Sequence, residues 1–309
     1  MKKLFVSILA AFTVFILGAC SDNTTQSENT SDKLVVTTTI GQIADAVKNI
    51  GGDKVEVLSL MGAGTDPHLY KATQGDIAKL QKADVIFYNG LHLEGKMLDV
   101  LEKMNKEKPT YAIGESIKNN DLRSKADDKT AIDPHIWFDI DIWSTALKEV
   151  ETGLIQADPN NKDYYKKNAN EYFNKLKELN DYATEEMSKI PVEQRVLVTA
   201  HDAFGYFGAA YGMEVEGLQG LSTDSEYGLG DVQKIVDLLV TRNIKAVFIE
   251  SSISERSINA VIEGAKKKGH DVKIGGELFS DAMGEEGTEE GTYIGMYKHN
   301  VNTIVNSLK

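Results

Sequence analysis

Residues 159–190 read PNNKDYYKKNANEYFNKLKELNDYATEEMSKI, a polar stretch in which apolar or small side chains recur at steps of four and three. That spacing places them on one face of an α-helix. Because no glycine or proline follows Pro159 within the stretch, we expect one helix of about 28 residues, roughly 42 Å long. Tyrosine and alanine on the buried face argue against a coiled coil. The positions are Tyr165, Ala169, Tyr172, Leu176, Leu179, Ala183 and Met187.

The segments on both sides of this helix alternate between strand-like and helix-like patterns. Runs rich in Val, Ile and Phe occur before it at 34–40, 55–60, 84–90 and 110–113, and after it at 195–200, 214–220, 246–251 and 272–276. Such alternation predicts parallel α/β structure in each half. We therefore expect an amino-terminal α/β lobe over residues 34–157, a rigid linking helix over 158–190 and a carboxyl-terminal α/β lobe over 191–309.

The first nineteen residues have a different character, because a charged MKK precedes the apolar run LFVSILAAFTVFILGA. This pattern predicts a signal peptide over residues 1–19, and the run is too short for a comfortable membrane span. It ends in LGAC at Cys20, the one cysteine of the sequence. The ending resembles a bacterial lipobox, in which the cysteine receives a diacylglyceryl group before cleavage. The alternative is an ordinary signal peptide that ends at Gly18-Ala19.

Residues 21–33, SDNTTQSENTSDK, contain no apolar side chain. We expect residues 20–33 to be a lipidated cysteine followed by a disordered tether with a reach of about 20 Å. Two acyl chains on Cys20 would hold the mature protein on the extracytoplasmic face of the cell membrane without spanning it.

The charge balance constrains the partners. The formal net charge is −13, while 41% of the residues are hydrophobic, enough for a substantial core. A strongly acidic chain is a poor partner for nucleic acid or anionic lipid and mildly favours cations.

Two stretches share one unusual triplet: GTDPHLY at 64–70 and AIDPHIW at 131–137, in a chain with only six histidines. In each, the aspartate can cap a helix start and the proline fits its first turn, so the imidazole is presented in a set direction. A single Asp-Pro-His is usually a plain helix start, but its repetition favours His68 and His135 as ligands. His201 directly follows a predicted buried strand, where α/β sheets place their ligand sites.

A carboxylate would complete four protein ligands in a cleft between the lobes. Asp281 is the best candidate, because it follows a predicted strand and has glycines nearby. The remaining histidines lie in ordinary settings and are interpreted as non-ligands: His92, His270 and His299. Three carboxylates are candidates to accept the second ring N–H of a ligand histidine: Glu250, Asp139 and Asp202.

Several motifs in order carry a family resemblance: the lipobox, TDPHLY, DPHIWFD, the long middle helix, VTAHDAFGYF, VFIESSIS and LFSDAMG. Together they resemble the manganese- and zinc-binding lipoproteins of bacterial ATP-binding-cassette (ABC) importers, across essentially the whole mature chain. The resemblance implies metal ligands at His68, His135, His201 and Asp281. It also implies a small hinge motion on metal loading, an ABC permease and its ATPase as partners, a monomer, and no enzymatic activity.

The choice of metal is less direct. Imidazole suits zinc, and manganese lies at the weak end of the affinity order for divalent ions. Zinc-importing relatives often carry a histidine-rich loop after the first ligand motif, and its absence here favours Mn²⁺. Some manganese-binding relatives have glutamate where this chain has His201, which keeps Zn²⁺ open as the alternative. The motifs GLHLEGKM and GLQGLSTDSEYGL look most like Bacillus-type manganese-binding lipoproteins.

Two other classes of function remain open from the sequence. A metal-dependent hydrolase would use similar residues but keep one coordination position free for an activated water. A surface adhesin is also compatible with an anchored lipoprotein, although no adhesive motif is present. Trp137 lies close enough to His135 in the sequence for its fluorescence to report metal binding.

Overall fold

The amino-terminal half folds around a four-stranded, all-parallel sheet with strand order β2-β1-β3-β4. The computed structural model describes residues 33–125 and 129–309, so the expected leader, Cys20 and nearly all of the tether lie outside the described residues. The central strand β1 is rich in β-branched residues, and Val36 pairs with Val57 on one side and Val85 on the other. The strands are β1 (Leu34–Thr38), β2 (Val55–Ser59), β3 (Val85–Tyr88) and β4 (Thr110–Ala112).

Four helices accompany this sheet: α1 (Gly41–Gly51), α2 (Gln74–Lys82), α3 (Leu98–Glu107) and α4 (Ile140–Ala157). Two of them begin at a residue whose side chain caps the helix. Thr73 caps α2 in a capping box with Asp76, and Asp139 caps α4 by accepting from the backbone N–H groups of Asp141 and Ile142. Such caps satisfy amide donors that the helix itself leaves free.

The carboxyl-terminal half holds two pairs of parallel strands, which the sequence pattern does not distinguish from one continuous sheet. The pairs are β5 (Val196–His201) with β6 (Glu214–Gln219) and β7 (Ala246–Glu250) with β8 (Lys273–Leu278). β5 lies next to β7, but no backbone ladder joins them in the described residues. At the end of β5 the His201 N–H donates to the Glu250 side chain instead of a β7 carbonyl. The helices here are α6 (Gly205–Tyr211), α7 (Leu229–Thr241), α8 (Arg256–Lys267) and α9 (Tyr293–Leu308).

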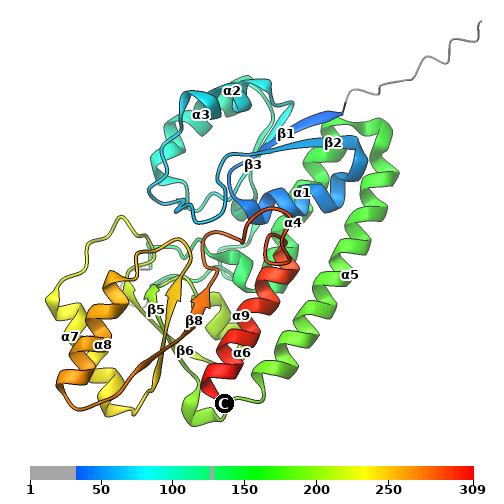
Figure 1. Ribbon diagram of the computed structural model, residues 1–309. Helices are drawn as coiled ribbons and strands as arrows, with labels where there is room; N and C mark the ends of the chain where they lie inside the picture. The colour runs from blue at the N-terminus through cyan, green and yellow to red at the C-terminus, as the bar shows by residue number, and fades with distance from the viewer. Residues whose placement is uncertain (1–32, 126–128) are drawn as a thin grey trace, which may run out of the picture. The chain divides into compact units, whose positions relative to one another are not determined.

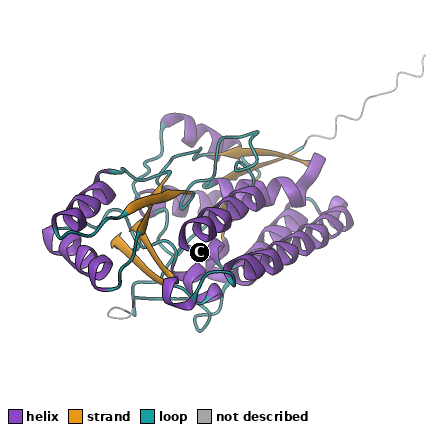
Figure 2. Cartoon of the chain, turned by 60° about the horizontal axis from the view of Figure 1, so that its bottom comes forward, coloured by secondary structure: helices purple, strands orange, loops and turns teal. Residues whose placement is uncertain are grey.

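The predicted long helix is confirmed as α5 (Lys162–Met187), 26 residues and about 39 Å long. All seven side chains assigned to its buried face are buried. The helix packs against α1 and α4 of the amino-terminal half and against α9 of the carboxyl-terminal half, and Figure 1 shows it running alongside both. Figure 2 shows the strands flanked by helices. All eight predicted strands are present, with ends that agree within two residues.

Removing one side chain from this face should destabilise the whole unit. Leu176 is fully buried on α5, so Leu176→Ala leaves a cavity and should lower the free energy of unfolding by about 2–5 kcal/mol. Asn174→Ala, at an exposed position two residues away, should change it by less than about 0.5 kcal/mol. Urea unfolding followed by circular dichroism measures both. Equal effects of the two substitutions would contradict a structural role for the buried face.

The main hydrophobic core contains side chains from both halves, and residues 33–309 form one compact unit. A second, smaller core lies under α7 and α8. In the described ranges, no helix combines the length and the apolar character that crossing a bilayer requires.

Candidate metal centre

Four side chains from four separate segments converge on one point. His68 lies in the turn between β2 and α2, His135 precedes the short 3-10 helix at Ile136–Phe138, His201 ends β5, and Asp281 follows β8. Their exposed fractions are 3%, 0%, 0% and 1%. One potential ligand atom from each lies within 4.8 Å of the others. The structure therefore brings together all four residues that the sequence singled out.

The distances match donors arranged around one point. The Nε2 atoms of His68 and His135 are 3.3 Å apart, and the Asp281 carboxylate is 3.3 Å from His135 Nε2 and 3.4 Å from His201 Nε2. Asp281 Oδ2 is 3.6 Å from His68 Nε2. Donors about 2.1 Å from a central ion in a tetrahedral arrangement would be about 3.4 Å apart. The group thus has the size of a coordination shell.

Two of the three imidazoles are oriented by a carboxylate behind them. His135 Nδ1 lies 2.7 Å from Asp133 Oδ1, and His201 Nδ1 lies 2.5 Å from Glu250 Oε2. These contacts direct the Nε2 atom of each ring toward the other ligands, the arrangement that makes an imidazole a better and better-aimed metal ligand. The interpretation of Glu250 as a supporting carboxylate agrees with its position.

The carboxylate that contacts the second ring nitrogen of His135 is not one of the three that the sequence suggested. Asp139 caps α4 and Asp202 lies nearby, but the carboxylate in contact with His135 is Asp133 of the same Asp-Pro-His triplet. The triplets also do not start helices with their aspartates as caps. Asp66 and Asp133 each accept the N–H of the histidine two residues later, at 2.9 and 3.0 Å. This side-chain turn is the local alternative to a helix cap.

Several buried atoms at the centre have no hydrogen-bond partner among the described residues: His68 Nδ1, His201 Nε2, Asp281 Oδ1 and Asp281 Oδ2. A buried polar atom without a partner costs roughly 1–3 kcal/mol, so such a concentration is unfavourable unless the atoms serve a ligand. Three of the four lie close to another candidate ligand: Asp281 Oδ1 is 3.3 Å from His135 Nε2, and Asp281 Oδ2 is 3.4 Å from His201 Nε2. Nitrogen and carboxylate donors together fit a divalent transition metal.

The pKa values of the four groups diverge. Burial lowers the pKa of His68 to about 4. Burial also opposes protonation of His135, but the adjacent carboxylates of Asp133 and Asp281 outweigh it and raise its pKa to about 9. The pKa of His201 lies well above its usual value, because Glu250 and Asp281 overcome the same burial effect. Burial favours a neutral Asp281, yet the imidazoles hold its pKa well below the usual range.

The other three histidines lie apart from this group. His270 Nε2 contacts the Ile244 carbonyl at 2.6 Å, and His299 Nε2 contacts the Glu277 carbonyl at 3.0 Å. His92 is exposed in a loop at a positive φ of 64°. None belongs to the clustered set of potential ligands.

Two substitutions should distinguish a carboxylate that orients a candidate ligand from one that caps a helix. Glu250→Gln should weaken metal binding about tenfold to a hundredfold, because the amide supports His201 less well than a carboxylate. Asp139→Ala should leave the affinity unchanged and lower the free energy of unfolding by about 1 kcal/mol through the lost cap. Calorimetric titration and urea unfolding measure the two quantities. A weaker site in Asp139→Ala, with Glu250→Gln unaffected, would reverse the assignment.

The fold and the ligand set define a class of protein, and comparison with known families agrees. Residues 36–307 match the family described as "Zinc-uptake complex component A periplasmic", and the chain belongs to this family. It is 56% identical over 298 residues to the manganese-binding lipoprotein MntA of Bacillus subtilis, covering 96% of this chain and 97% of that protein. It is 33% identical over 321 residues to the manganese ABC transporter substrate-binding lipoprotein PsaA of Streptococcus pneumoniae, covering 100% and 99%.

A solved structure gives the same answer for the fold. The periplasmic zinc-binding protein TroA from Treponema pallidum superimposes with a TM-score of 0.87 at 47% identity, covering 89% of this chain and 99% of that one. The expected α/β architecture with one long helix is therefore that of the TroA-type metal-binding proteins.

Proposed function

We propose that the protein is an extracytoplasmic lipoprotein that captures Mn²⁺ and delivers it to an ABC importer. The observation that supports this most is the convergence of three imidazole Nε2 atoms and one carboxylate within 4.8 Å at a fully buried point. The ion would be cargo: it enters the cleft between the lobes over 34–157 and 191–309, is held by His68, His135, His201 and Asp281, and leaves at the permease.

Manganese is the preferred cargo for a structural reason as well as the family relationship. Asp281 faces the imidazoles with both oxygens, Oδ1 toward His135 and Oδ2 toward His68 and His201. A carboxylate placed in this way can supply two oxygens, which gives five donors in all. Carboxylate oxygen suits manganese, whereas protein-bound zinc is usually held by four donors. Zn²⁺ remains the alternative, since three imidazoles bind it well.

A carrier role fits this centre better than catalysis. A metal-dependent hydrolase needs a coordination position open to water and substrate. A cavity of about 350 Å³ borders Asp281, but none of the three histidines lines it, so a substrate there would reach the ion only past Asp281. Incubation of the metal-loaded protein with ester, phosphoester and amide substrates should give no turnover.

The anchor and partners follow from the leader and the family. Cys20 would carry the lipid that holds the protein on the outside of the cell membrane, and the protein would act as a monomer that docks on a permease with its ATPase. Neither a nucleic acid nor an adhesive ligand is needed for this role. Adhesion that persisted after removal of all four metal ligands would favour the adhesin instead.

The test of the cargo combines two measurements. Elemental analysis of protein purified without added metal, with competition titrations of Mn²⁺ against Zn²⁺, should give one site per chain for either ion. Deletion of the gene should impair growth in metal-depleted medium, with rescue by added manganese. Rescue by zinc alone would assign the alternative cargo.

A further inference from the structure

Three of the four candidate ligands are fixed to one interlocked set of carboxyl-terminal elements. His201 and Asp281 belong to that half by sequence, and the His135 segment is tied to it by hydrogen bonds. The Trp137 indole N–H donates to the Ser280 carbonyl at 3.1 Å, immediately before Asp281. The Tyr293 hydroxyl donates to the Trp137 carbonyl at 2.6 Å.

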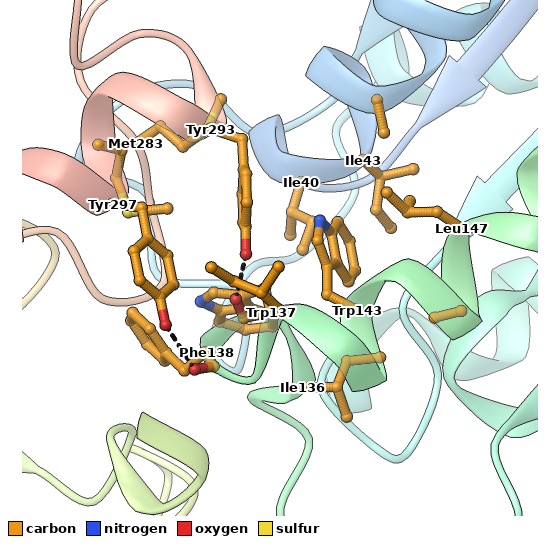
Figure 3. Close-up of a cluster of buried hydrophobic side chains, with 14 of the residues drawn as sticks. Ile40, Ile43, Ile136, Trp137, Phe138, Trp143, Leu147, Met283, Tyr293 and Tyr297 are labelled. Carbon is orange, nitrogen blue, oxygen red and sulfur yellow. Dashed lines mark hydrogen bonds between the residues drawn. The ribbon is translucent and has the colours of Figure 1, made fainter. Parts of the chain in front are cut away.

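A second tyrosine of α9 makes a similar hydrogen bond to the segment that follows His135. The Tyr297 hydroxyl donates to the Phe138 carbonyl at 2.8 Å, and the Phe138 ring stacks on Phe204 with centroids 4.4 Å apart. Figure 3 shows Tyr293 and Tyr297 directing their hydroxyls to the main chain at Trp137 and Phe138. His135 is therefore fixed relative to α9 and the segment after β8, although it precedes α5 in the chain.

His68 lacks comparable support. Its Nδ1 atom is buried and has no hydrogen-bond partner in the described part of the chain, whereas His135 and His201 each have a carboxylate there. Its main-chain N–H donates to Asp66 Oδ1 at 2.9 Å. The position of this imidazole therefore depends on the turn over residues 66–68.

One hydroxyl from the other half holds this turn. Thr223, 8% exposed, donates through Oγ1 to Asp66 Oδ2 at 2.6 Å. Thr223 lies in the loop over residues 220–228, after β6, and its own carbonyl accepts from Gln219 Nε2 at 3.0 Å. The Asp66 carboxylate thus joins the His68 main chain to a braced loop of the carboxyl-terminal half.

We propose that Thr223 is a positioning residue that holds His68 against the three other ligands, and that His68 is the ligand that departs first when the ion is released. The proposal rests on the proposed metal-binding function. A hydrogen bond to a charged acceptor in a half-buried setting is stronger than one between neutral groups, so its loss should shorten the lifetime of the closed site. Loss of this hydrogen bond should mainly change the rate at which the metal dissociates, because most changes at an existing interface alter dissociation more than association.

The test compares Thr223→Val, which keeps the shape and removes the hydroxyl, with Thr223→Ser, which keeps the hydroxyl. Full-length protein loaded with Mn²⁺ is mixed with excess chelator, and the rate of metal transfer is recorded. Thr223→Val should release the ion about tenfold faster, while Thr223→Ser should release it within about twofold of the wild-type rate. The melting temperature of each metal-free variant is measured in parallel.

A matched control removes another contact between the two halves, made by the same loop over residues 220–228. Lys96 Nζ pairs with Asp224 Oδ2 at 2.7 Å, one residue from Thr223, and among the described residues no hydrogen bond joins this exposed pair to the turn over residues 66–68. Lys96→Met should change the release rate less than about threefold, as expected for a surface ion pair. If Lys96→Met accelerated metal release as much as Thr223→Val, then the contacts between the two halves in general, and not the hydrogen bond to Asp66, would control release.

The remaining outcomes are distinct. Thr223→Val that melts earlier but releases metal at the wild-type rate would overturn this inference and leave the proposed function intact. Wild-type protein that binds neither Mn²⁺ nor Zn²⁺ would overturn the proposed function, and this inference with it.

Discussion

Asp281→Ala is expected to weaken Mn²⁺ binding by more than about a hundredfold, a larger loss than substitution of a supporting residue such as Glu250 should cause. Asp281 is the one anionic member of the candidate ligand group, and its carboxylate lies within 3.6 Å of all three imidazole Nε2 atoms. Without it, the site retains three neutral donors and no anionic donor that could contact a divalent ion directly. Calorimetric titration with Mn²⁺ measures the affinity.

Asp45→Asn is the matched control for this substitution. Asp45 is also a buried carboxylate, 9% exposed, but it accepts a hydrogen bond from the Tyr172 hydroxyl and lies outside the ligand group. It should bind Mn²⁺ with the wild-type affinity. Normal binding by Asp281→Ala would show that the ion lies elsewhere, and a loss of equal size in both variants would indicate a general defect of folding.

Metal binding should release about two protons at pH 7. At that pH the raised pKa values of His135 and His201 keep both rings protonated beside the ionised Asp281 in the metal-free protein, whereas His68, with its pKa near 4, is neutral. All three rings must be neutral to bind a metal. Protons therefore compete with the ion, and the apparent affinity should rise about a hundredfold per pH unit between pH 6 and 8, flattening as His135 loses its proton near pH 9.

Titration with Mn²⁺ at pH 7 in buffers of different ionisation enthalpy counts the released protons directly. A slope near two is expected, and a slope of zero would contradict the assigned protonation states. The pH dependence of the stability of the metal-free protein independently checks the direction of the His135 pKa shift. Because the pKa of His135 is raised from 6.5 to about 9, its contribution to the stability of the metal-free protein is complete below pH 6.5 and is lost as the pH rises toward 9.

The sequence predicted the fold well where periodicity is strong. The buried face of α5 is long and uninterrupted, and each strand of the first sheet is a short apolar run between turn residues, so local pattern determined these elements. The split of the carboxyl-terminal strands into two pairs was not predictable, because pairing between strands that are distant in the chain is a tertiary property that the local pattern does not contain.

The candidate ligands were predicted because two Asp-Pro-His triplets and two strand ends carry visible signals. The residues that orient the candidate ligands were harder to predict. Asp133 lies in a quoted triplet, yet the sequence suggested a helix cap, and only the turn geometry shows that its carboxylate reaches His135 Nδ1. Thr223 has no local signal, because its partner Asp66 lies 157 residues away in the chain.

The central claim is that four side chains, distant in sequence, hold a single divalent ion. A crystal structure of the Mn²⁺-loaded protein, with diffraction data collected on both sides of the manganese absorption edge, tests it most directly. One anomalous peak should lie within about 2.0–2.4 Å of Nε2 of His68, His135 and His201 and of both carboxylate oxygens of Asp281. A peak at any other place, or no peak in protein shown to contain manganese, would contradict the account.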